Sequence, residues 1–289
     1  MRRALFLCTF PCAALLVLAS ARAGEVTETL NIAWEVFWQQ QGYVQSVSKW
    51  RDPIRVHVSG TGAQRHRAFV LAELGRVARR AGIDLAEAEP EGPPANLEVE
   101  LLPDDLTRVG LYFACRTLRT PAAGVIRRAK ITAEERSLRT CLLHEAMHAM
   151  GMPGHPRGGS ILSYYRGSSA LTANDEFMLK AWYSDDIKPG MSPLAALAVF
   201  ARRLVEAAPE GERLEAERSA AEFQHRALAQ LESIAAGKGE PPRILFQSST
   251  LTPAGLARGR LEAQRALAAA KAETASLEKS PNAATPADR

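Results

Sequence analysis

The chain has 289 residues, of which 46% are hydrophobic and 24% are charged, with a formal net charge of +4. This is the composition of an ordinary globular protein, and the length suits one sizeable domain with an extension. Three of the positive charges, on Arg2, Arg3 and Arg22, lie near the N-terminus, and without them the net charge is +1. This small net charge argues against a nucleic-acid partner and against attraction to an anionic membrane.

The N-terminus carries the pattern of a secretory signal peptide. Basic Met1–Arg3 precedes the apolar run Ala4–Leu18, and Ala21–Ala23 fits a small-residue cleavage site before Gly24. The run is short for a membrane span, and no other stretch is long and apolar enough. We therefore predict a signal peptide over residues 1–23, a periplasmic or secreted location, and no stable membrane insertion after cleavage.

Two of the four cysteines, Cys8 and Cys12, lie inside the predicted signal peptide. The other two, Cys115 and Cys141, are expected to form a disulfide, because pairs of cysteines usually do so in an oxidising compartment. The alternatives are a thiolate that binds metal or acts as a nucleophile, and two free buried thiols.

The first half of the chain mixes helical and extended patterns. Residues 27–41 predict a helix in which Trp34, Phe37 and Trp38 form a packing face. A second helix is expected over His66–Ala81, ended by the following glycine. Strand patterns occur at Ile54–Val58, where His57 falls on the polar side, and at Leu97–Leu101 and Val125–Ile131.

A third helix is predicted from Thr132 to about Met150. Thr132 and the glutamate three residues later resemble a capping box, and Gly151 provides the end signal. The order of elements predicts an α+β fold with a mixed sheet backed by helices.

This third helix carries His144-Glu145-Ala146-Met147-His148. Residues four apart on a helix share one face, so His144 and His148 can bind the same zinc ion. Glu145 can reach a water molecule next to such an ion and act as a general base. The motif is the zincin signature, although it also arises by chance on surface helices.

Three of the six histidines lie within twelve residues, because His155 follows in a Pro-Gly-His-Pro turn that cannot be helical. The segment resembles the metzincin clan of zinc peptidases, which carry H-E-x-x-H-x-x-G-x-x-H followed by a methionine turn. Here the third histidine comes one residue late, and Ser160-Ile161-Leu162-Ser163-Tyr164 has leucine in place of methionine. The resemblance implies zinc on His144, His148 and His155, with Asp175 or Glu176 as the alternative third ligand.

The same resemblance aligns Tyr164 with a tyrosine that approaches the metal or the oxyanion in some metzincins. The alternative is a buried tyrosine with a hydrogen-bond partner. Leu171–Tyr183 resembles the last helix of metzincin domains, with Thr172 as the N-cap and Asp175 and Glu176 as capping or surface residues. The stretch Cys141–Met191 also resembles a family of uncharacterised bacterial secreted proteins with a zincin-like core.

After Pro193 the sequence becomes rich in alanine, leucine, glutamate and arginine. Helices are predicted beyond residue 194, around Leu214–Leu231 and over Leu256–Leu277. We therefore expect a metzincin-like catalytic domain over 24–192, a helical extension over 193–279 and a disordered tail over 280–289.

These features predict a zinc-dependent endopeptidase acting on peptide or protein substrates, with Glu145 and Tyr164 as catalytic residues. One alternative is an inactive zinc-binding module used in binding or assembly, which would not need Glu145. Another is a zinc hydrolase acting on cell-wall peptides or other amides. A substrate peptide is expected to add to a sheet edge, for which Leu97–Leu101 is the candidate strand.

Overall fold

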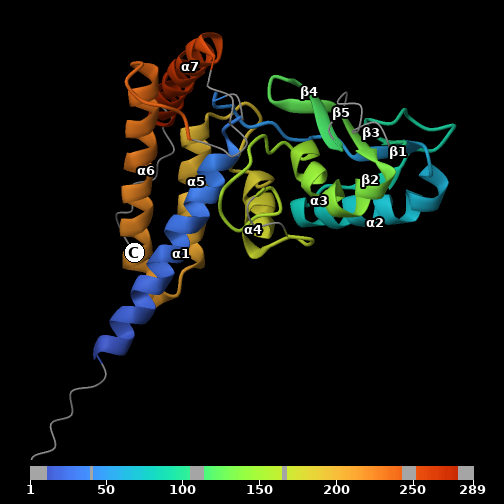
Figure 1. The fold of residues 1–289 in the computed structure, drawn as a ribbon. Helices are drawn as coiled ribbons and strands as arrows, with labels where there is room; N and C mark the ends of the chain where they lie inside the picture. The colour runs from blue at the N-terminus through green and yellow to red at the C-terminus, as the bar shows by residue number, and fades with distance from the viewer. Residues whose placement is uncertain (1–11, 40–41, 105–113, 165–167, 243–251, 279–289) are drawn as a thin grey trace, which may run out of the picture.

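Five strands form one mostly parallel sheet with helices beside it, in a computed structural model that describes residues 12–39, 42–104, 114–164, 168–242 and 252–278 (Figure 1). The strand order is β2-β1-β3-β5-β4. Only β4 runs antiparallel to its neighbour. The bounds are β1 Ile54–Gly60, β2 Leu85–Glu87, β3 Leu97–Leu102, β4 Cys115–Ala122 and β5 Val125–Glu134.

The sheet has one buried face and one open face. Along β3, Leu97, Val99 and Leu101 are buried, whereas Glu98 between them is exposed, as the alternating sequence predicts. The buried face packs against helices α2 (Ala63–Ala81) and α3 (Leu138–Ala149). The open face carries charged side chains and the exposed His57, which confirms the prediction that this histidine lies at the surface.

The prediction that Leu97–Leu101 is an edge strand for substrate binding is wrong. The strand β3 lies between β1 and β5, and parallel ladders on both sides occupy its backbone hydrogen bonds. The edges are β2 and β4, and β4 is the one that packs against α3. Sequence alternation reveals a half-buried strand but not its place in the order of strands.

The predicted start of α3 at Thr132 is also wrong. Thr132 belongs to β5, where it pairs with Arg116 of β4, and the strand continues to Glu134. A 3-10 turn, η2 (Glu135–Ser137), then leads into the helix. Burial of Ile131 and Ala133 on the sheet outweighs the local capping signal. The predicted end is confirmed, because α3 stops at Ala149 and Gly151 adopts a φ of +109°.

The first helix, α1 (Cys12–Val36), begins earlier and ends earlier than the predicted 27–41. The chain leaves the helix at Phe37, and Trp38 then forms a bridge with Val44. The predicted aromatic packing is confirmed, because Trp34, Phe37 and Trp38 are all buried. Residues 1–11 of the predicted signal peptide lie outside the described residues, and cleavage before Gly24 remains a prediction.

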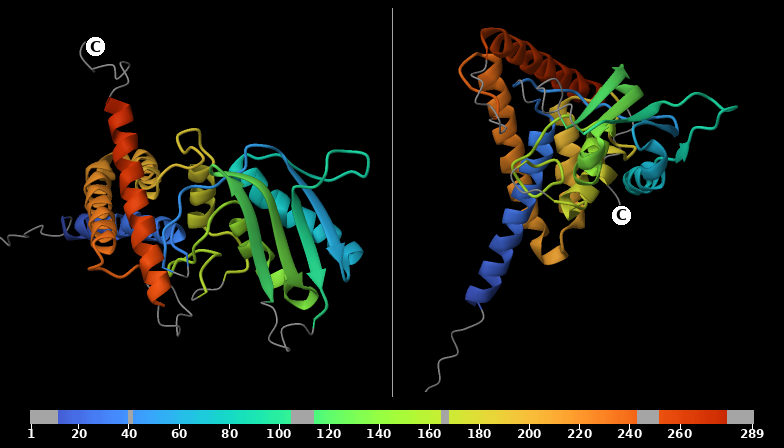
Figure 2. Two further views of the ribbon diagram at one scale, coloured as in Figure 1. Left: turned by 90° about the horizontal axis from the view of Figure 1, so that it is seen from above. Right: turned by 45° about the vertical axis from the view of Figure 1, so that its right-hand side comes forward.

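Helices α5 (Pro193–Ala207), α6 (Arg213–Ala235) and α7 (Pro253–Glu278) confirm the three helices predicted after residue 193. They gather with α1 on one side of the sheet, and α4 (Ala173–Trp182) lies between them and α3 (Figures 1 and 2). α1 contacts both α5 and α6, and Trp34 Nε1 donates to Gln230 Oε1 at 2.8 Å. The predicted disordered tail falls outside the described residues.

No helix within the described ranges is long and apolar enough to cross a membrane. The hydrophobic core is continuous from the sheet to the C-terminal helices, through residues such as Leu142, Trp182 and Phe200. The division into a catalytic domain over 24–192 and a helical extension over 193–279 remains a prediction.

Candidate metal centre

Three histidines converge at the C-terminal end of α3. His144 and His148 lie one helical turn apart, and His155 approaches from the loop that follows the helix. His148 Nε2 lies 3.1 Å from His144 Nε2 and 2.9 Å from His155 Nε2. One ring nitrogen of each side chain lies within 4.8 Å of the others, and no other group of three potential ligands occurs among the described residues.

Backbone carbonyl groups fix the orientation of two of the rings. His144 Nδ1 lies 3.0 Å from Ile161 O, and His148 Nδ1 lies 2.7 Å from Met152 O. Since a carbonyl oxygen can only accept, both Nδ1 atoms must donate, and the neutral rings then present lone pairs at Nε2. Lone pairs that face one another across about 3 Å repel unless a cation lies between them.

The three imidazoles are held in the neutral form that binds metal. Burial is the largest cause that lowers the pKa of each ring, and the pKa of His155 falls to about 3. The neighbouring histidines lower the pKa of His148 further, because two protonated rings would repel. Protons therefore compete weakly with a metal ion for these nitrogens near neutral pH.

His155 reaches the centre because its loop is tied to the end of α1. Gly154 N donates to Val36 O at 2.8 Å, and a Cβ on Gly154 would lie only 2.3 Å from Glu35 O. Arg157 donates to the buried Glu35 carboxylate through its backbone N at 2.7 Å and through Nε at 2.8 Å. These contacts hold the loop that carries His155 against the end of α1.

Asp175 lies beneath the centre as a structural residue and outside the histidine group. Its Oδ1 accepts from Ser160 Oγ at 2.5 Å, and its Oδ2 accepts from Ile161 N at 2.9 Å and Thr172 N at 2.8 Å. Thr172 and Asp175 form a capping box at the start of α4, which confirms the predicted N-cap. Glu176 instead pairs with Arg80 at 2.9 Å, so neither alternative ligand joins the histidines.

Replacing Asp175 with alanine is expected to destabilise the protein by about 3 kcal/mol, because it leaves buried donors unsatisfied. It should also weaken metal binding by about 10-fold to 100-fold, since the Ile161 carbonyl that orients His144 would lose its support. Urea unfolding and metal titration measure the two effects. The matched control, Glu176→Ala, removes a partly exposed ion pair and should cost less than about 1 kcal/mol; equal losses in both variants would contradict the role given to Asp175.

Glu145 lies beside the histidines and is only 6% exposed. Burial raises the pKa of its carboxyl group to about 7, although a hydrogen bond from Thr117 partly opposes this. Thr117 Oγ1 lies 2.6 Å from Glu145 Oε2 and 3.0 Å from Glu145 O. A carboxyl group with a pKa near neutrality can both accept and return a proton at physiological pH.

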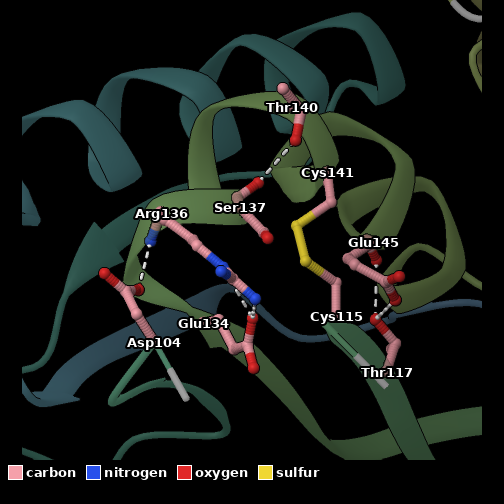
Figure 3. Close-up of a disulfide and its surroundings, with 9 residues drawn as sticks. All are labelled: Asp104, Cys115, Thr117, Glu134, Arg136, Ser137, Thr140, Cys141 and Glu145. Carbon is pink, nitrogen blue, oxygen red and sulfur yellow. Dashed lines mark hydrogen bonds and ion pairs between the residues drawn. A yellow bond between two sulfur atoms is a disulfide. The ribbon is translucent and has the colours of Figure 1, made fainter. Parts of the chain in front are cut away.

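The predicted disulfide between Cys115 and Cys141 is confirmed. It joins the first residue of β4 to α3, one helical turn before Glu145, so Thr117 and Glu145 lie directly beyond it (Figure 3). The covalent link therefore holds the edge strand against the helix at the point where their side chains meet.

Tyr164 lies over the histidines and is 45% exposed. Its ring stacks on His155 with 4.3 Å between ring centroids, and it lies 5.2 Å from His144. It therefore lies next to the histidines, and its exposure does not fit the alternative of a buried tyrosine. The leucine that replaces the methionine of the turn, Leu162, is fully buried.

Two residues at the centre were not expected from the sequence, Thr117 and Arg119. Both lie on β4, whose inward positions are Cys115, Thr117 and Arg119, while Leu118 points outward and is 51% exposed. This pattern reverses the usual polarity of a strand, so no hydrophobic alternation marks it. The signal that the sequence offered was Arg119 itself, a charged residue at a position of β4 that faces inward.

Comparison with known families identifies a relationship for the larger part of the chain. The family described as "Protein of unknown function (DUF2927)" matches residues 29–202, which is more than half of the chain and includes all three histidines and Glu145. No curated protein and no solved structure matches the chain. The chain therefore belongs to the DUF2927 family.

Proposed function

We propose that the protein is a zinc-dependent peptidase with a zincin-like catalytic centre. The observation that carries this proposal is the convergence of three neutral imidazoles, His144, His148 and His155, beside a buried glutamate. A binding site for metal alone would require the histidines but not the acid.

The donor set fits zinc. Imidazole nitrogens are preferred zinc ligands, and a tetrahedral ion with bonds of about 2.0–2.1 Å separates its ligand atoms by about 3.3 Å. The observed Nε2 separations of 2.9 Å and 3.1 Å are close to that value. Three protein ligands leave one position open, as in catalytic rather than structural sites. A zinc ion bound here would supply Lewis acidity for amide hydrolysis.

Glu145 supplies the acid–base chemistry in this proposal. Its carboxylate accepts a proton from the attacking water and returns it to the leaving amine, and Thr117 orients the carboxylate through Oε2. Tyr164 is exposed and adjacent to the ligands, so its hydroxyl can donate to the developing oxyanion. The substrate would lie along β4, because that strand borders Glu145 and, among the described residues, no strand pairs with its outer side.

The proposed site of action is the periplasm or the exterior of the cell. Its support is the N-terminal signal pattern together with the disulfide between Cys115 and Cys141, a bond that persists in oxidising compartments.

The first test measures metal content and proteolysis on the same preparation. Purified protein lacking residues 1–23 is expected to hold about one zinc per chain by mass spectrometry and to cleave peptides from a mixed library. Removal of the metal with a chelator should abolish cleavage, and added zinc should restore it.

Each alternative result has a definite meaning in that test. Zinc without cleavage of any peptide would favour a metal-binding module in binding or assembly. Cleavage restricted to cell-wall peptides or non-peptide amides would identify a related hydrolase. A folded protein that binds no zinc would contradict the proposal.

A further inference from the structure

A cationic cavity of about 740 Å³ adjoins the metal centre. It lies between β4, Gln39 with residues 43–48, and the part of α7 from Arg258 to Ala269, and Thr117 belongs to its wall. Because the hydroxyl of Thr117 also contacts Glu145, the cavity begins where the proposed reaction takes place. The side chains of Arg116, Arg119, Arg258 and Arg265 line it, with Glu262 as the acidic residue.

Positive side chains outnumber negative ones in the wall of the cavity. Glu262 is already paired with Arg265 at 3.0 Å, and Arg258 lies over the ring of Tyr43 at 4.0 Å. No ion pair with a carboxylate joins Arg116, Arg119 or Arg258 within the part of the chain that the structure describes. A cavity with three uncompensated guanidinium groups attracts anions.

Arg119 is the arginine that faces the centre. It shares the inward face of β4 with Thr117, two residues away, and Nη1 donates to Ser48 Oγ at 2.9 Å. Ser48 in turn packs against the end of α3, where Ser48 O would lie 1.9 Å from a Cβ on Gly151.

The guanidinium group of Arg119 is charged, and most of its hydrogen-bond donors have no partner among the described residues. Burial lowers its pKa to about 10, which still leaves it protonated at neutral pH. Among the residues that the structure describes, one of its five N–H donors has a protein partner, Ser48 Oγ. Arg119 is partly buried. Arginines removed from water usually pair with a carboxylate, often through two parallel hydrogen bonds, because an uncompensated charge away from water is costly.

We propose that Arg119 binds a carboxylate group of the substrate in this cavity, next to the bond that is cleaved. The proposal rests on the proposed function, because it names the class of peptide that the same centre would accept. The carboxylate can come from the C-terminus of a peptide or from an acidic side chain, and the guanidinium geometry fits both. The first source would make the protein a carboxypeptidase, and the second an endopeptidase selective for acidic residues.

The test uses three randomised peptide pools with acetylated N-termini. One pool has free C-termini, one has amidated C-termini without acidic residues, and one has amidated C-termini with a fixed central glutamate. The zinc-loaded protein is assayed for cleavage, and binding of the pools to the metal-free protein is measured by isothermal titration calorimetry. The variants are Arg119→Met, Arg119→Lys and, as control, Arg127→Met, which changes an exposed arginine on β5.

The wild type is expected to prefer one carboxylate-bearing pool over the neutral pool by about 10-fold to 100-fold in cleavage and in binding. The preference should vanish in Arg119→Met, return in part in Arg119→Lys and remain in Arg127→Met. Thermal unfolding is recorded for each variant, and Arg119→Lys provides the comparison if Arg119→Met fails to fold. Which pool is preferred identifies the source of the carboxylate.

Other outcomes separate this inference from the proposed function. Equal cleavage of all three pools, or an equal loss for all pools in Arg119→Met, would overturn carboxylate recognition while peptidase activity stands. Selective binding of carboxylate peptides without any cleavage would overturn the peptidase proposal while supporting the role of Arg119.

Discussion

Replacing Glu145 with glutamine is expected to lower peptide hydrolysis by about 10²-fold to 10⁴-fold, the usual contribution of a general base. Glutamine keeps the shape of the side chain and can still accept the hydrogen bond from Thr117, but it cannot take a proton from water. The zinc content should stay unchanged, because the proposed ligands are the three histidines. Initial rates on a cleaved peptide, with metal analysis of the same sample, measure both quantities.

The same variant should be more stable than the wild type once the metal is removed. The folded pKa of Glu145, about 7, lies above its ordinary value of 4.5. Stability from the protonated form is therefore present below pH 4.5 and is lost as the pH rises through 7. At pH 8 the buried carboxylate costs about 3 kcal/mol, which Glu145→Gln recovers, whereas near pH 4 the two proteins should be equally stable.

Urea unfolding of the metal-free proteins at the two pH values measures this difference. Glu98→Gln, a change at an exposed position on the open face of the sheet, is the control and should alter neither activity nor the pH dependence. A Glu145→Gln protein that keeps most of its activity would remove the glutamate from the mechanism.

Replacing His148 with alanine should weaken zinc binding by about 100-fold or more, since even residues that only orient ligands contribute about 10-fold to 100-fold. His148 lies between the other two histidines, with Nε2 within 3.1 Å of both. His155→Ala should have a comparable effect if the loop histidine is the third ligand. Competition with a chromophoric chelator gives the affinities.

His57→Ala is the matched control, because this histidine lies exposed on the open face of the sheet. Full zinc affinity in His155→Ala would contradict the assignment of the third ligand. In that case Glu176→Ala would show whether the carboxylate of Glu176, and not His155, is the third ligand.

The parts of the structure that follow from short-range patterns could be predicted from the sequence. Helix α2 with its glycine stop, the alternation of β3 and the capping box of α4 each depend on neighbouring residues. The start of α3 could not be predicted in this way. Its capping signal at Thr132 was overridden by pairing with β4, a strand that shows no hydrophobic alternation.

The residues of the candidate site also fall into two groups, those that local spacing predicts and those that depend on contacts between distant parts of the chain. His144, Glu145 and His148 lie on one helix, so their spacing alone predicts that they are neighbours. The approach of His155 depends on contacts between its loop and Glu35, about 120 residues earlier in the chain. Thr117 and Arg119 depend on the order of strands, which no local pattern determines.

The packing of α1 sets a limit on when the protein can finish folding. It contacts α4, α5 and above all α6, and the hydrogen bond from Trp34 reaches Gln230, 196 residues further along the chain. This N-terminal helix must therefore wait for a helix synthesised much later before the apolar side chains between them are covered. Because the Glu35 and Val36 contacts that hold the loop of His155 come from α1, the third histidine can be secured only after nearly the whole chain is available.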